Sequence, residues 1–241
     1  MTPARRAPRR AWLAAAIVIA VAGAGLALAV TSRGGSPGPA RRPPAPAAAP
    51  GTSGPQLPRL SLAGLRWSSY HGVELPSSAV AGPRHTGGGL AWGFAGTPLG
   101  ALLAALNIAV RANAQWGPDV FVPTIGDQVT GPDAAALLAA CQAGYGQASQ
   151  AAHITGGQPL GDADATEEAF RWAAWTPADA TADLVSAGPG SGGVTIRAST
   201  RVQVVWQDGD WRVVAPPGGD WGNAAARLTS LAGYTVFPGQ G

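Results

Sequence analysis

The chain has 241 residues, 46% of them hydrophobic, and is therefore long enough to bury one sizeable core. Its formal net charge of +3 is unevenly distributed, because residues 1–42 hold seven arginines and no acid whereas residues 43–241 hold nine arginines against thirteen acids. The second part thus carries a charge of −4. We exclude nucleic-acid binding by this part, since such binding needs a basic surface that neutralises phosphates.

The first predicted element is a transmembrane helix over residues 11–31. Residues 11–30 form an uncharged run of twenty, and a helix of that length crosses the hydrocarbon layer of a bilayer. Because four arginines precede the run, we expect residues 1–10 to be a cytoplasmic basic tail. The protein would then be a single-pass protein of the cell membrane with an extracytoplasmic main domain. A cleaved signal peptide is the alternative, because Ala27-Leu28-Ala29 matches a cleavage site of small residues.

A linker is predicted to separate this helix from one folded domain. Residues 32–59 are rich in proline, glycine and alanine and offer little apolar bulk, which indicates a disordered linker. Residues 60–241 are expected to form the extracytoplasmic domain. Cys141 is the only cysteine, so an intramolecular disulfide is excluded and the domain must be stabilised by packing.

The first half of the domain has the periodicity of helices. Thr97 is a suitable N-cap and Pro98 a suitable first residue for a helix that Gly117-Pro118 should end. Apolar residues recur along this segment at helical spacing. The opposite side, which we expect to meet solvent, carries Asn107, Arg111 and Gln115.

Asn113 projects near the apolar side of the same helix, either as a helix-end cap or as a group that lines a pocket. A second helix is predicted from Pro132 to about Ser149, with Cys141 buried on its apolar stripe. Residues 116–131 contain two prolines and three glycines, so we expect a structured loop there. The glycine-rich residues 85–96 are expected to form a flexible loop.

The second half of the domain alternates apolar and polar side chains, as strands do. Residues 194–207 indicate one long half-buried strand, and Asp208-Gly209 is a favoured two-residue hairpin turn. This turn pairs Gln207 with Asp210, Trp206 with Trp211, Val204 with Val213 and Val202 with Ala215. Both tryptophans then lie on the apolar face, where we expect them to be part of the core.

Residues 169–175 and 181–187 indicate two earlier strands, so four antiparallel strands would follow two or three helices. The predicted fold class is therefore α+β, with the helices packed on one face of a curved antiparallel sheet. Residues 222–241 are expected to add a short helix and a terminal strand, or else a tail that orders only against a partner.

Two segments carry a resemblance to a known fold. The helix opened by GFAGTPLGALLAA and the later hairpin VVWQDGDWRVVAPPGG resemble the nuclear transport factor 2-like (cystatin-like) superfamily, which implies a cone-like domain. The order of basic start, anchor, linker and domain is similar to uncharacterised membrane proteins of high-GC Gram-positive bacteria. It is also similar to assembly components of conjugative type IV secretion machines, which implies a scaffolding role in conjugation or secretion.

No catalytic or metal-binding motif stands out. The histidines, His71, His85 and His153, lack the spacing of a zinc site. Residues 161–170 are acidic but lack the ligand loop of a calcium site, so we expect a solvated acidic loop before a strand or short helix. We therefore assign no catalytic residue, no metal ligand and no cofactor.

Two functions are compatible with these patterns. The first is a membrane-anchored extracytoplasmic scaffold or accessory protein of an envelope complex, which contacts the cell membrane through residues 11–30 and binds protein partners but no nucleic acid. The second is an exported small-ligand-binding or catalytic cone. The residues predicted to line a pocket or make contacts are Tyr70, Asn113, Tyr145 and Trp221.

Overall fold

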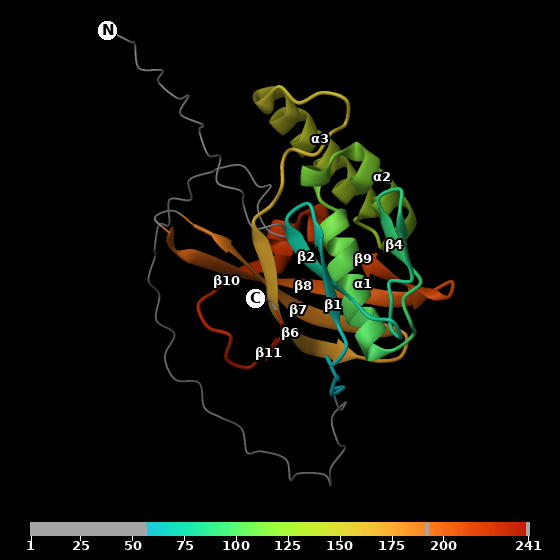
Figure 1. Cartoon of the computed structure of the whole chain (residues 1–241). Coiled ribbons are helices and arrows are strands. Elements are labelled where there is room, and N and C mark those ends of the chain that lie inside the picture. Colours follow the sequence, from blue (N-terminus) through green and yellow to red (C-terminus); the bar gives the residue numbers. More distant parts are fainter. Residues whose placement is uncertain (1–56, 191–192, 240–241) are drawn as a thin grey trace, which may run out of the picture.

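The computed structural model describes residues 57–190 and 193–239 (Figure 1). The predicted transmembrane helix and nearly all of the predicted linker lie outside these residues. Within the described part of the chain, no helix combines the length and the apolarity needed to cross a membrane.

The elements follow one another in an α+β order. The helices are α1 (Pro98–Arg111), η1 (Ala114–Trp116), α2 (Pro118–Gln128), α3 (Ala134–Ala152), η3 (Pro217–Gly219) and η4 (Trp221–Ala224). The strands are β1 (Arg66–Tyr70), β2 (Val73–Ser77), β3 (His85–Gly87), β4 (Leu90–Trp92), β5 (Val129–Thr130), β6 (Ala165–Trp175), β7 (Asp179–Pro189), β8 (Thr195–Gln207), β9 (Asp210–Val214), β10 (Ala225–Leu228) and β11 (Thr235–Val236).

Nine strands of the described residues form one strongly curled sheet in the order β1-β2-β6-β7-β8-β9-β5, with β10 beside β8 and β11 beside β6. Helix α1 lies in the hollow of this half-barrel, and α2 and α3 lie near one end (Figure 1). The predicted α+β class is confirmed. The sheet is not wholly antiparallel, because β2 pairs with β6 and β5 pairs with β9 in parallel.

The predicted hairpin is confirmed in its register. Strands β8 and β9 pair Trp206 with Trp211 and Val204 with Val213. Asp208 and Gly209 both adopt positive φ, at 54° and 82°, as this turn requires. The predicted pairing of Val202 with Ala215 does not form within the hairpin, because β9 ends at Val214.

The two tryptophans differ in burial. Trp211 is only 1% exposed and its indole N–H donates to the carbonyl of Ala95 at 2.9 Å. Trp206 is half-buried and meets Trp211 edge to face at 5.3 Å between ring centroids. The expectation of core packing therefore holds fully for Trp211 and partly for Trp206.

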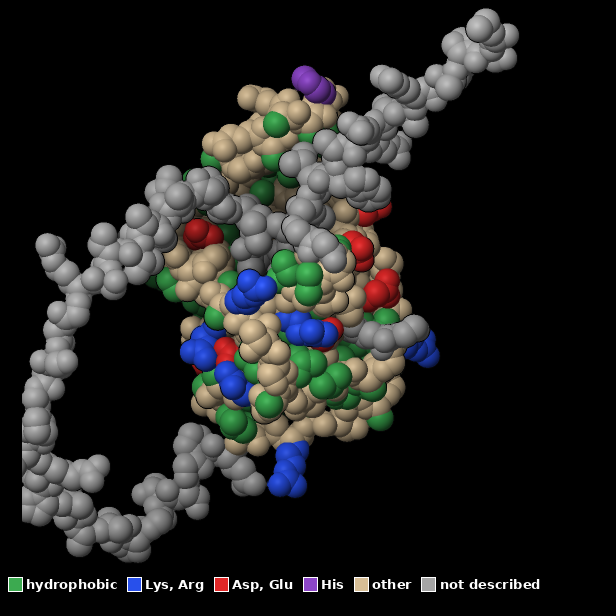
Figure 2. Space-filling view, turned by 90° about the vertical axis from the view of Figure 1, so that its left-hand side faces the viewer, with side chains coloured by type: hydrophobic (Ala, Val, Ile, Leu, Met, Phe, Trp, Pro, Cys, Tyr) green, Lys and Arg blue, Asp and Glu red, His purple; other side chains and the backbone are tan. Residues whose placement is uncertain are grey.

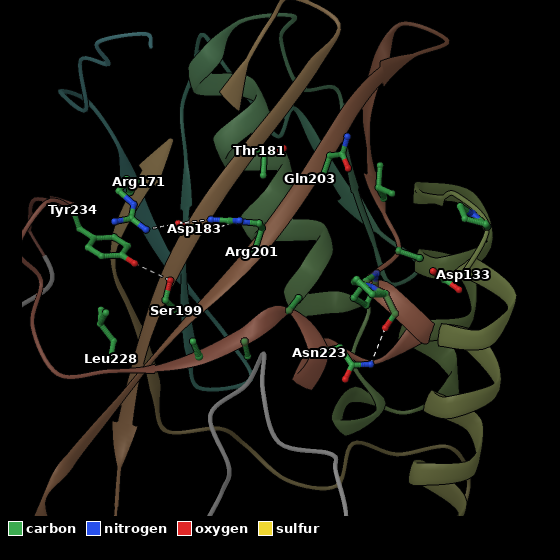
Figure 3. Close-up of a pocket in the computed structure, with 18 residues that line it drawn as sticks. Asp133, Arg171, Thr181, Asp183, Ser199, Arg201, Gln203, Asn223, Leu228 and Tyr234 are labelled. Carbon is green, nitrogen blue, oxygen red and sulfur yellow. Dashed lines mark hydrogen bonds and ion pairs between the residues drawn. The ribbon is translucent and has the colours of Figure 1, made fainter. Parts of the chain in front are cut away.

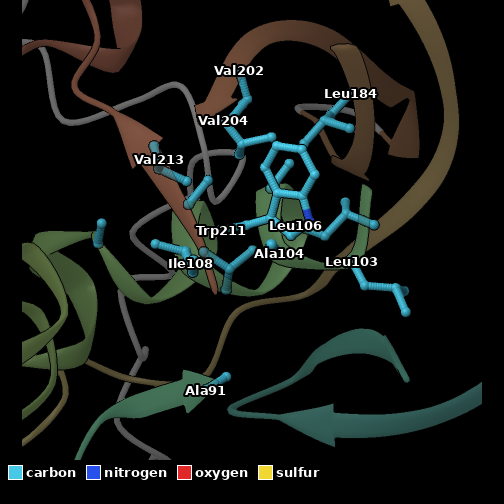
Figure 4. Close-up of a cluster of buried hydrophobic side chains, with 14 of the residues drawn as sticks. Ala91, Leu103, Ala104, Leu106, Ile108, Leu184, Val202, Val204, Trp211 and Val213 are labelled. Carbon is cyan, nitrogen blue, oxygen red and sulfur yellow. The ribbon is translucent and has the colours of Figure 1, made fainter. Parts of the chain in front are cut away.

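The core fills the hollow of the sheet. Side chains of α1, among them Leu103, Leu106 and Ile108, pack against the face of the sheet that is turned toward the helix (Figure 4). We call this the inner face. It contributes Leu184, Val202, Val204, Trp211 and Val213, none more than 1% exposed. The opposite, outer face of the sheet is turned away from α1.

The prediction of a solvent-facing side on α1 is wrong. The helix contacts β2, β4, β7, β8, β9 and α2, so all of its residues from Gly100 to Arg111 are buried. Asn107 is 3% exposed and donates to the carbonyl of Pro76 at 3.1 Å. The predicted N-cap is present, because Thr97 accepts a hydrogen bond from the backbone N–H of Gly100 at 3.2 Å. The helix ends at Arg111, and η1 follows before Gly117.

The predicted loop at residues 116–131 is also wrong, because α2 occupies most of it. Pro118 stands at the start of this helix, where its missing N–H has no cost, and Pro123 lies inside it. Phe121 and Ile125, one turn apart, are buried in the core. Tertiary packing thus outweighs the low helix propensity of proline and glycine.

Two further elements were not predicted. Strands β1 and β2 form a hairpin closed by His71 and Gly72, both with positive φ. The predicted flexible loop at residues 85–96 contains the β3–β4 hairpin.

The second predicted helix is confirmed as α3, which begins at Ala134 and extends to Ala152. The two predicted earlier strands are confirmed as β6 and β7.

The C-terminal part crosses the outer face of the sheet. We call residues 225–237 the C-terminal strap. It pairs first with β8 as β10 and then with the far edge of β6 as β11. Between these strands, Tyr234 lies over the outer face, with its hydroxyl 3.1 Å from the hydroxyl of Ser199 on β8.

Candidate functional site

Two of the predicted pocket residues, Tyr70 and Tyr145, make structural contacts. The guanidinium of Arg111 lies 4.3 Å from the ring centroid of Tyr70. Burial raises the pKa of Tyr70, and the charge of Arg111 acts in the opposite direction. The hydroxyl of Tyr145 donates to the carbonyl of Gln158 at 2.8 Å. Each tyrosine therefore ties two segments of the domain together.

The other two, Asn113 and Trp221, line one cavity of about 290 Å³ between α3 and the C-terminal 3-10 helices. Asn113 is the N-cap of η1, where its side chain accepts from the backbone N–H of Gln115 at 3.1 Å. It therefore caps the start of η1 and not the end of α1, whose C-cap is Ala112, and it also borders a cavity. Trp221 is 7% exposed, and its indole donates to the carbonyl of Ala112 at 3.2 Å.

Cys141 borders the same cavity from α3. It is 6% exposed, as the sequence predicted, and its sulfur lies 3.9 Å from the carbonyl oxygen of Ala112. Burial raises the pKa of the thiol to about 11, so the thiol is protonated at neutral pH. Since the thiolate is the nucleophilic form, this cysteine is poorly suited to covalent catalysis.

A larger groove, about 670 Å³ in volume, lies on the outer face of the sheet (Figure 3). Its floor is polar and is formed by Arg171, Thr181, Asp183, Ser199, Arg201 and Gln203 on β6, β7 and β8. Its walls are mostly apolar and include Pro132, Val214, Pro216, Pro217, Ala226 and Leu228. The groove therefore combines hydrogen-bonding groups at its base with hydrophobic sides.

Three charged residues form a row across the floor. Arg171, Asp183 and Arg201 occupy directly opposed positions on β6, β7 and β8. Arg201 donates from Nε and Nη2 to the two oxygens of Asp183 at 2.8 and 3.2 Å. Arg171 donates from Nη2 to the same carboxylate at 2.7 Å. Opposite charges on neighbouring strands thus fix the row in place.

The carboxylate of this row is buried while the guanidiniums reach solvent. The side chain of Asp183 is 6% exposed, against 47% for Arg171 and 59% for Arg201. Burial acts to raise the pKa of Asp183, but the hydrogen bonds from Arg201 and Arg171 outweigh it and hold this pKa below its usual value. The row therefore has two cations and one anion, and Asp133, at the start of α3, adds a second carboxylate to the lining of the groove.

Tyr234 of the C-terminal strap closes one end of the row. The guanidinium of Arg171 lies 4.6 Å from the centroid of its ring, and its hydroxyl meets that of Ser199 (Figure 3). Figure 2 shows arginine side chains lying among apolar ones on one face of the molecule.

The predicted acidic loop before β6 is only partly correct. Asp162 and Asp164 are exposed, but Glu167 lies inside β6, is 0% exposed and accepts a hydrogen bond from the hydroxyl of Ser186. Burial raises the pKa of Glu167 to about 7, and the hydrogen bond from Ser186 acts against this shift. Among the residues that the structure describes, no group of three or more acidic, histidine or cysteine side chains could hold a metal ion.

A protein-family profile described as a domain of unknown function (DUF8175) matches residues 29–236. The chain belongs to the DUF8175 family. No curated protein and no solved structure matches it. The matched range contains every residue that lines the groove, from Pro132 to Tyr234, so the groove is built wholly from the DUF8175 domain.

Sequence reasoning missed the charged row of this DUF8175 domain. Alternation within each strand does show that Arg201 points away from the apolar side. The row itself depends on the register between strands, and β6 contains two irregularities, between Glu167 and Ala169 and between Trp172 and Ala174. Because such a bulge shifts one strand against the next, the alignment of Arg171 with Asp183 could not be read from the sequence.

Proposed function

We propose that this chain is a membrane-anchored extracytoplasmic scaffold that binds another protein in an envelope complex. The groove on the outer face of the sheet supports this proposal above all. It is open, it is lined by polar groups and apolar walls, and it lies on the face of the sheet away from α1. Protein-binding surfaces typically combine an apolar area with a small number of hydrogen-bonding groups.

The burial of α1 favours this function over the catalytic cone. In a cone that binds a ligand, the hollow of the sheet would be the binding site. Here the hollow is filled by α1 and the inner-face side chains, including Trp211. Two of the predicted pocket residues, Tyr70 and Tyr145, are occupied in contacts with Arg111 and Gln158.

The membrane anchor is part of the same proposal. Residues 11–30 have the composition of a single transmembrane helix, and the arginines before them favour a cytoplasmic N-terminus. Proline-rich residues 32–59 would then hold the domain away from the bilayer. The resemblance in layout to assembly components of conjugative type IV secretion suggests conjugation or secretion as the process served.

A small-ligand function is the second candidate, and one observation favours it. The cavity of about 290 Å³ brings Asn113 and Trp221 together with Cys141. The indole N–H and the thiol already meet the carbonyl of Ala112, so a small molecule in the cavity would pack mainly against the indole ring and the apolar walls. Filling the cavity by Ala140→Leu would then abolish any thermal stabilisation that such a molecule gives.

Site-specific photocrosslinking of the membrane-bound chain tests the scaffold function. A photoreactive phenylalanine at Gln203, in the groove floor, should capture a discrete protein in cells. The same residue at Ser68, which is exposed on β1, is the matched control and should capture none. Equal labelling at both positions, or none at Gln203 despite normal folding, would contradict binding in the groove.

A further inference from the structure

We propose that the charged row in the groove binds a carboxylate side chain of an extended acidic segment of the partner. This inference rests on the proposed scaffold function and names the chemistry of the partner. Its basis is the excess of guanidinium over carboxylate in the row, where Arg171 and Arg201 face the single anion Asp183.

Hydrogen-bonding capacity remains on both arginines. Arg201 uses Nε and Nη2 on Asp183, and no acceptor among the described residues takes a hydrogen bond from its Nη1. Arg171 uses only Nη2. A guanidinium has five N–H donors in one plane, so a second carboxylate can be accepted at the free edge.

The shape of the groove favours a peptide segment over a flat anionic surface. The row lies on the floor, and the walls include Val214, Pro216 and Leu228. A lipid bilayer presents a broad plane and would meet these walls first. An extended chain can place one side chain on the floor while its neighbours contact the apolar walls.

The attraction is local, because residues 43–241 together carry a charge of −4. An acidic partner is therefore not drawn to the domain as a whole. The positive excess is confined to the row, since Asp133 also lines the groove, and the guanidiniums of Arg171 and Arg201 are about half exposed. Added salt should therefore weaken the attraction. This arrangement would confine an acidic segment to the groove.

The test uses the full chain in detergent micelles and two fluorescein-labelled ten-residue peptides. One alternates glutamate with alanine, and the other replaces every glutamate with glutamine. Fluorescence anisotropy should show the glutamate peptide binding at least about fivefold more tightly, as expected for charge-assisted pairing with partly exposed arginines. Arg171→Gln should lower the affinity for the glutamate peptide by about threefold to fivefold. The loss should be no larger, because Arg201 remains in place as the bidentate partner of Asp183.

The substitution Asp183→Asn distinguishes a binding role from a structural one. It removes the internal anion while keeping the size of the side chain, so both guanidiniums become available and the glutamate peptide should bind several-fold more tightly. If the row served only to hold the strands together, the same substitution would leave binding unchanged or weaken it. Arg84→Gln, at an exposed arginine outside the groove, should leave binding unchanged.

The outcomes separate this inference from the proposed function. Equal affinity for both peptides, or preferential binding of phosphatidylglycerol vesicles through the row, would overturn the inference. If the two peptides bound equally well, crosslinking at Gln203 in cells would still support the proposed scaffold function. If circular dichroism shows that Asp183→Asn does not fold, the affinities of Arg171→Gln and Arg84→Gln for the glutamate peptide are compared instead. Equal affinities of these two variants would refute the carboxylate site.

Discussion

Arg111 shows how a single residue can be buried with its charge. It is 5% exposed, and none of the ion pairs among the described residues includes it. Its Nη1 donates to the carbonyl and side-chain oxygens of Asn107 at 3.0 and 2.9 Å, and its guanidinium covers the ring of Tyr70. A cation at the C-terminal end of α1 also interacts favourably with the helix dipole. These contacts together replace the missing carboxylate.

We predict that Arg111→Lys lowers the free energy of unfolding by about 1 to 3 kcal/mol, because a lysine ammonium cannot both form these hydrogen bonds and cover the ring in a planar stack. Thermal or urea unfolding followed by tryptophan fluorescence measures this change. Tyr70→Phe keeps the ring and should have a smaller effect than Tyr70→Leu. If the two substitutions at Tyr70 were equally costly, the stacking explanation would be wrong.

Glu167 is a second buried titratable group, and it couples stability to pH. Its pKa is about 7 in the folded protein, against 4.5 for an ordinary glutamate. Between pH 4.5 and about pH 7, the carboxyl of Glu167 is therefore protonated in the folded state and ionised in the unfolded state. The contribution of Glu167 to the free energy of unfolding is therefore greatest below pH 4.5. This contribution falls by roughly 3 kcal/mol as the pH rises to about 7.

Glu167→Gln should remove this dependence. The variant should be more stable than the wild type at pH 8, where the wild type must bury a carboxylate, and should be similar to it below pH 5. Denaturant titrations at the two pH values provide the measurement. Glu168→Gln is the matched control, since Glu168 pairs with Arg197 near the surface and should show no gain at pH 8.

At the scale of elements, the contact between η3 and α3 depends on a glycine. Gly219 has a φ of 69°, and a Cβ atom there would lie 2.3 Å from the backbone nitrogen of Leu137. Any side chain would therefore force η3 away from α3. The cavity that Asn113 and Trp221 line is bordered by the same two helices.

We predict that Gly219→Ala destabilises the fold by about 2 to 4 kcal/mol, through overpacking and an unfavourable φ. A Cβ atom added at Gly146, in α3, would have no neighbour within 4 Å. Gly146→Ala should therefore stabilise the fold by about 0.5 to 1 kcal/mol. Melting temperatures of the two variants against the wild type report both effects. A neutral result for Gly219→Ala would mean that η3 does not hold this position in solution.

Local patterns predicted some elements well and others poorly. The β8–β9 hairpin followed from alternation and from Asp208-Gly209, because both signals are local. Helix α2 could not be predicted in the same way, since Pro123 and Gly126 argue against it and its stability comes from packing. The β1–β2 hairpin is likewise short, and its inner residues Val73 and Leu75 gain their burial from contacts distant in sequence.

At the scale of the whole molecule, the groove was less predictable than the fold. It requires three strands in register, the start of α3 and the C-terminal strap to meet on one face. No single segment carries that information. The buried side of α1 shows the same effect, because Asn107 and Arg111 look solvent-exposed until β2 covers the helix.

The proposed membrane anchor also leads to a prediction at this scale. The full-length chain should stay in the membrane fraction after washing with alkaline carbonate, because residues 11–30 are long enough and apolar enough to span the bilayer. A shortened form released into the soluble fraction would indicate cleavage near Ala27-Leu28-Ala29 and would refute the anchor. Immunoblotting of both fractions gives the measurement, with a known integral protein as control.

The two ends of the described chain lie side by side. The indole of Trp67 on β1 donates to the carbonyl of Pro238 at 3.2 Å, and Leu57 shares a cavity with Thr235. A fluorescent reporter joined after Gly239 would therefore emerge next to Leu57, where the described part of the chain begins. Such a fusion would label the protein in living cells while leaving the far end of the groove, near Pro132, open to other molecules.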